Sequence, residues 1–105
     1  MIPKMVRFFE KYAIYDYSDE EIVAEICRRV KQLRKGCRFS QQSLANASGV
    51  SVATIKRIDS GQMKDMNIMT LIQILRATGS LDGVADLVPD VPDPLYKTKI
   101  RVPKP

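Results

Sequence analysis

The chain has 105 residues, 45% hydrophobic and 28% charged, with no apolar run that could cross a membrane and no export signal, so we expect a cytoplasmic protein of one domain. It has no histidine, and its two cysteines, Cys27 and Cys37, are expected to be reduced, so no catalytic site, metal site or cofactor is indicated. The net charge is +5, and residues 28–64 hold nine basic side chains against Asp59 alone, which favours a polyanionic partner.

Residues 1–17 form an N-terminal extension rich in aromatic side chains. Five of the seven aromatic residues of the chain lie here. Helical spacing would place three of them, with Met5, on one face of a short amphipathic helix: Phe8, Phe9 and Tyr12. The rings either cover the core of the domain or offer a surface to a partner or a second copy. The sequence leaves both interpretations open.

The domain itself is expected over residues 18–88, and it begins with a long helix. Ser18 and Glu21 have the spacing of a capping box, in which each side chain bonds the backbone N–H of the other residue. Gly36 is expected to end this helix. The apolar residues that form its inward stripe are Ile22, Val23, Ile26, Val30 and Leu33.

Residues 40–61 predict two short helices joined by a tight turn. Ser40 and Ser51 are helix caps, Gly49 makes the turn between the helices, and Gly61 closes the second helix. The expected helices are Gln41–Ala47 and Val52–Ser60. This is the layout of a helix-turn-helix, in which the second helix enters the major groove of DNA.

The inner faces of these two helices are also predicted by spacing. The two helices must cross closely, and the small Ala45 stands where the crossing requires it. The side chains expected to be buried between the helices and their neighbours are Leu44, Val50, Ile55 and Ile58.

Two further helices follow. Asp65 or Asn67 caps a fourth helix that Gly79 stops, and Ser80 is expected to cap a short fifth helix. The residues of the fourth helix expected to face the core are Ile68, Leu71, Ile72 and Leu75, and the apolar residues of the fifth are Leu81, Val84, Leu87 and Val88.

Residues 89–105 are a proline-rich basic tail, with five of the six prolines of the chain. Between residues 96 and 102, apolar and basic side chains alternate with the period of a strand. The tail is either mobile, a strand that pairs with a partner, or a basic arm on DNA phosphates.

The stretch over residues 40–61 resembles the phage-repressor and Cro-like group, also called the xenobiotic-response-element family. The resemblance covers about residues 20–88 and implies a compact all-α domain of five helices that binds DNA. Ser48 departs from the aliphatic residue of many members. The resemblance also pairs Arg34 with Asp59, an interaction that is otherwise a weak surface contact.

The resemblance implies roles for the second helix of the motif. Val52 and Ala53 would meet base edges, where an apolar side chain contacts a thymine methyl group, and Arg57 would bind a guanine with two hydrogen bonds. Lys56 serves either a phosphate or a base.

Other positions would contact the DNA backbone. Gln41 would bond a phosphate, while Arg38 and Lys64 would act as clamps that set the register without reading sequence. The complete set expected to contact DNA is Arg38, Gln41, Gln42, Ser51, Val52, Ala53, Thr54, Lys56, Arg57 and Lys64.

These features predict a dimeric, sequence-specific transcriptional repressor on a palindromic operator in double-stranded DNA, associated with the nucleoid. The resemblance implies a homodimer interface around the fifth helix, with Val84, Leu87 and Val88. The size and the short tail also resemble HipB-like antitoxins, which repress their own operon and bind a HipA-like kinase toxin. The alternative is a protein-interaction module that kept this fold without reading DNA, and Lys56 and Arg57 argue against it.

Overall fold

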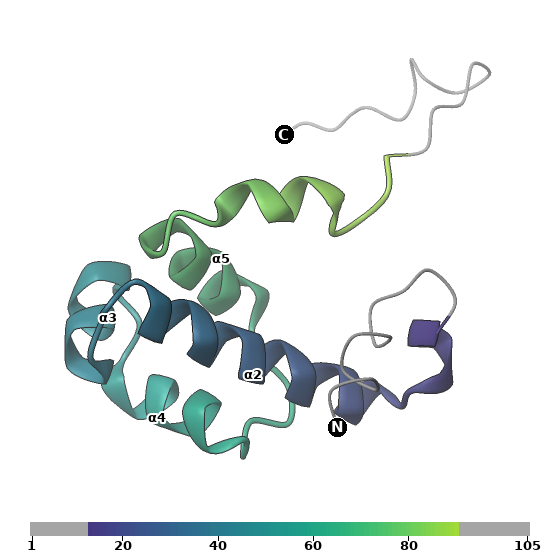
Figure 1. Ribbon diagram of the computed structural model, residues 1–105, viewed down its shortest axis with the longest axis horizontal. Helices are drawn as coiled ribbons and strands as arrows, with labels where there is room; N and C mark the ends of the chain where they lie inside the picture. Colours follow the sequence, from purple (N-terminus) through teal and green to yellow (C-terminus); the bar gives the residue numbers. More distant parts are fainter. Residues whose placement is uncertain (1–12, 91–105) are drawn as a thin grey trace.

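The computed structural model describes residues 13–90, and this part of the chain is all-helical, with no strand (Figure 1). Its elements are η1 (Ala13–Asp16), α2 (Asp19–Gly36), α3 (Gln41–Ser48), α4 (Val52–Ser60), α5 (Ile68–Ala77) and η2 (Leu81–Asp86), where η marks a 3₁₀ helix. The predicted all-α class is confirmed for these residues, and none of their helices is both long and apolar enough to span a membrane. The predicted helix around Phe8 and the alternating segment 96–102 lie outside the described residues.

The start of α2 is confirmed and its end differs from the prediction. Ser18 Oγ accepts a hydrogen bond from the Glu21 N–H at 3.1 Å, and Glu21 Oε1 accepts one from the Ser18 N–H at 2.8 Å. Gly36 is the last helical residue, but the left-handed residue that closes the helix is Arg38, with φ 63°. The Arg38 N–H bonds to Lys35 O, and the next N–H bonds to Arg34 O, each at 3.0 Å, which is the Schellman pattern.

The boundaries of α3 and α4 follow from their caps. Ser40 and Ser51 each accept a bond from a backbone N–H three residues on, and Gly49 and Gly61 close the helices with φ of 81° and 78°. Because these values lie in the left-handed region, a side chain at either glycine would be strained. The helix α3 is one residue longer than predicted, and its last residue, Ser48, donates a side-chain hydrogen bond to Leu44 O at 2.7 Å.

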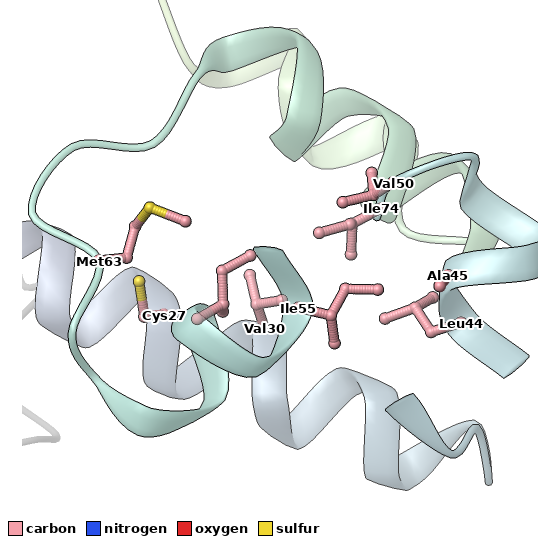
Figure 2. Packing of buried hydrophobic residues seen from close by; sticks show 9 residues of the cluster. Cys27, Val30, Leu44, Ala45, Val50, Ile55, Met63 and Ile74 are labelled. Carbon is pink, nitrogen blue, oxygen red and sulfur yellow. The ribbon is translucent and has the colours of Figure 1, made fainter. Parts of the chain in front are cut away.

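One core joins the four α-helices (Figure 2). The predicted burial of Leu44, Val50, Ile55 and Ile58 and of the small Ala45 is confirmed; the core also includes Cys27, Val30, Met63 and Ile74. The sulfur atoms of Cys27 and Met63 lie at one end of this cluster, and Leu44 and Ala45 at the other (Figure 2). Burial raises the pKa of the Cys27 thiol, which stays neutral and packs as a small apolar group.

The prediction for α5 was wrong in part. Ile74 is its fully buried residue, whereas Ile68 is 56% exposed, and Ile72 and Leu75 are half-buried. Asn67 is the cap, with its side chain accepting the Met69 N–H at 2.7 Å. The following element is a 3₁₀ helix rather than an α-helix, and Ser80 makes no side-chain cap bond to it.

Glu25, on α2, is a buried carboxylate that the sequence did not indicate. Arg28 donates to both of its oxygens, at 3.0 and 2.9 Å, and Arg29 Nε donates to one at 2.7 Å. The hydrogen bonds from Arg28 hold the pKa of Glu25 below its ordinary value of 4.5, although burial acts in the opposite direction. A carboxyl group whose pKa is lowered by folding stabilises the protein above its unfolded pKa, and this contribution is lost as the pH falls through the folded value.

We therefore expect Glu25→Gln to make the free energy of unfolding depend less on pH in the acidic range. Urea unfolding followed between pH 3 and pH 7 should show the wild type losing stability below about pH 4.5, and the variant losing less over that range. Asp19→Asn, at an exposed position of the same helix, is the control. A wild-type pH dependence that Glu25→Gln leaves unchanged would assign the acid sensitivity to other carboxyl groups.

Candidate nucleic-acid interface

A buried polar network fixes α3 and α4 against α2. Asp59 Oδ2, in the last turn of α4, accepts hydrogen bonds from Arg34 Nη2 and Gln41 Nε2, both at 2.8 Å. Arg34 Nη1 also donates to Phe39 O at 2.7 Å, in the segment that leads into α3. The side chains of Arg34 and Asp59 are only 11% and 8% exposed, so their ion pair is a buried one and not the weak surface contact that was the alternative.

This network changes the surroundings of Gln41, which was predicted to bond a phosphate. Gln41 lies at the first position of α3 and is half-buried, with one amide N–H directed to Asp59. An amide nitrogen carries two donors, so a second N–H remains for an external acceptor. Because Asp59 is paired with Arg34, its charge is compensated where an anion would approach.

The outer face of α4 carries the exposed side chains of the motif. Ala53, Lys56 and Arg57 are exposed, and neither cation has a recorded ion pair within residues 13–90. Val52, predicted to face outward, is half-buried and packs against the core. Thr54 is half-buried as well, and its hydroxyl bonds Ser51 Oγ at 2.9 Å within the cap.

The remaining predicted contacts lie at the edges of this face. Arg38, before α3, and Lys64, after α4, are exposed and unpaired in the part of the chain that the structure describes. Gln42 is exposed, and its Nε2 donates to Asn46 Oδ1 at 3.1 Å. Two cations on α4 and one on either side of the α3–α4 pair are thus open to a polyanion.

The predicted dimer residues have different surroundings. Leu87 and Val88 are 47% and 73% exposed at the end of η2, whereas Val84 is half-buried. Sequence reasoning missed Ile68 and Met69, which are 56% and 60% exposed at the start of α5. Since η2 packs on α5 and runs back along it, its end lies toward the start of α5 (Figure 1).

Comparisons with protein-family models, curated proteins and solved structures found no match to this chain. Within residues 13–90, no three histidine, cysteine or carboxylate side chains gather in a way that could hold a metal ion.

Proposed function

We propose that this protein is a sequence-specific DNA-binding repressor that acts as a homodimer on a palindromic operator, in the cytoplasm and on the nucleoid. Helices α3 and α4 would form the helix-turn-helix, with α4 in the major groove. The observation that supports this most is the pair of exposed, uncompensated cations, Lys56 and Arg57, on a short helix whose other face is held by the core. A module that had lost DNA readout would have no use for this pair.

Each exposed group has a separate role in this proposal. Arg57 reads a guanine edge and Ala53 contacts a thymine methyl group, while Lys56 binds a phosphate or a base. Arg38 and Lys64 bind phosphates at the two ends of the motif, and their contacts set the register of α4 in the groove. Ser51, Thr54 and Val52 contribute through the cap and the packing of the first turn of α4.

Arg57→Ala is the direct test of this function. A duplex selected by the wild-type protein from a random-sequence pool should bind the variant about 5- to 150-fold more weakly, because a bidentate guanine contact contributes about 1–3 kcal/mol. Binding to random DNA should change little. Arg76→Ala, an exposed arginine on α5, is the control for the removed charge. Equal losses on the selected and random duplexes would remove Arg57 from base recognition.

Arg38→Gly should separate stability from DNA binding. Arg38 holds a left-handed conformation that glycine adopts without strain, so the variant should be more stable by roughly 1 kcal/mol. It should also bind every duplex more weakly and reduce the salt slope by about 0.9 for each phosphate that it no longer neutralises. Arg38→Ala removes the charge but keeps the strain, so it should weaken binding equally without the gain in stability. A salt slope that neither variant reduces would exclude the clamp.

The resemblance to HipB-like antitoxins extends the proposal to an autoregulating antitoxin that binds a HipA-like kinase toxin. The neighbouring gene tests this extension: an open reading frame for a kinase-like toxin, whose product co-purifies with this protein, is the expected result. A repressor with no such neighbour and no such partner would keep the DNA-binding function and lose the antitoxin role.

A further inference from the structure

The helix α2, which precedes the helix-turn-helix, also carries basic residues, and two of them have no role in the proposed DNA interface. Lys31 and Lys35 lie in the C-terminal half of α2, in the turns that lead toward Arg38. Neither has a recorded ion pair within residues 13–90. Arg28, on the same side of the helix, differs because two hydrogen bonds tie it to Glu25.

The contacts of α2 show which way these lysines face. Each step of three residues back along an α-helix turns the side chain by about 60° in a constant sense. Cys37 lies toward the end of α5, where its Sγ donates to Thr78 O at 3.6 Å, and Arg34, the next step, contacts Asp59 of α4. Lys31 is one further step round, past α4, and Lys35 lies about 40° beyond Lys31. Both lysines thus face away from α5: the half-buried Lys31 lies about 60° and the exposed Lys35 about 100° round α2 from the contact of Arg34 with α4.

Spacing and charge suit a phosphate backbone. Lys31 and Lys35 are about 6 Å apart along the helix axis, and successive phosphates of one DNA strand advance by about 3.4 Å along the duplex. The acidic residues of α2 near the solvent, Asp19, Glu20 and Glu21, are at the opposite end of the helix. Lys35 stands in the last turn of α2, where the helix dipole favours a cation, but it repels Lys31 four residues before it, and an anionic partner would relieve this repulsion.

We infer that Lys31 and Lys35 form a second phosphate-binding track, which continues from Arg38 along α2 and binds the DNA backbone outside the half-site that α4 reads. The inference rests on the proposed DNA-binding function, and it adds a stretch of flanking duplex to the ligand. The track carries no sequence information, because phosphates are the same at every base pair.

The test compares two duplexes that share the sequence selected by the wild-type protein. One is trimmed to the selected sites, and the other extends about ten base pairs further at each end. The double variant Lys31→Gln/Lys35→Gln should bind the short duplex as the wild type does. On the long duplex it should lose about 1.8 from the salt slope per protomer, from two phosphates at about 0.9 each. Over a fourfold change in salt this slope difference amounts to about a 12-fold change in relative affinity per protomer.

The control for the removal of one charge is Arg76→Gln, at an exposed position on α5, and it is compared with the single variant Lys35→Gln. Arg76→Gln should change the affinity for the short and the long duplex equally. Circular dichroism should show that the variants are folded. Equal losses from the double variant on both duplexes would overturn the inference by placing the lysines inside the half-site. If the double variant loses no affinity on either duplex, the inference is also overturned, because the two lysines then face solvent or bind an acidic protein. A wild-type protein that selects no sequence counts against the proposed function instead.

Discussion

Replacing Arg34 with methionine is expected to destabilise the protein by about 3–5 kcal/mol, because it leaves a buried carboxylate without its charge partner. Asp59 would keep only the hydrogen bond from Gln41, and Phe39 O would lose its bond at 2.7 Å. Urea unfolding, read by circular dichroism, should show the midpoint falling by about 2 M. A loss below about 1 kcal/mol would mean that the pair behaves as an exposed one.

The double variant Arg34→Met/Asp59→Leu separates stability from function. Replacing both members of a buried ion pair with apolar side chains is often neutral or stabilising, so most of the lost stability should return. Operator affinity should not return with it, because Gln41 loses the acceptor that fixes its side chain. A double variant that regains both properties would show that the network serves stability alone.

The α3–α4 pair could be predicted from sequence because its determinants are local. Ser40, Ser51, Gly49 and Gly61 each act within a few residues, so their caps and turns can be recognised without knowledge of the rest of the fold. The end of α2 was less predictable: Gly36 is the residue type expected there, yet Arg38 adopts the left-handed conformation.

Apolar spacing failed on α5 because that helix is apolar on more than one face. Sequence periodicity cannot choose between Ile68 and Ile74 in such a helix, and tertiary contacts place Ile74 in the core. The same limit applies to the interface. The outward position of Arg57 followed from helical spacing, whereas the half-burial of Val52 depends on how closely α4 crosses its neighbours.

The second large prediction concerns the exposed apolar residues of α5 and of the segment at the end of η2, and it tests the proposed homodimer. Ile68→Gln/Leu87→Gln/Val88→Gln should convert the proposed homodimer into a folded monomer, because these side chains are 47–73% exposed in the single chain and contribute little to its own core. Sedimentation equilibrium measures the change. Affinity for a palindromic operator should fall by about 10²- to 10⁴-fold, since the second half-site no longer benefits from a linked protomer.

Tyr15→Gln is the matched control, because Tyr15 is 84% exposed and lies in the aromatic segment that was the other candidate for a dimer surface. It should leave both the dimer and the operator affinity intact. If Tyr15→Gln gives the monomer and the triple variant does not, the dimer forms through the N-terminal segment. For both the triple variant and Tyr15→Gln, affinity for a single half-site should stay near the wild-type value, because the α4 face of each protomer is unchanged. Loss of half-site binding in a folded variant would instead place the substituted residues at the DNA.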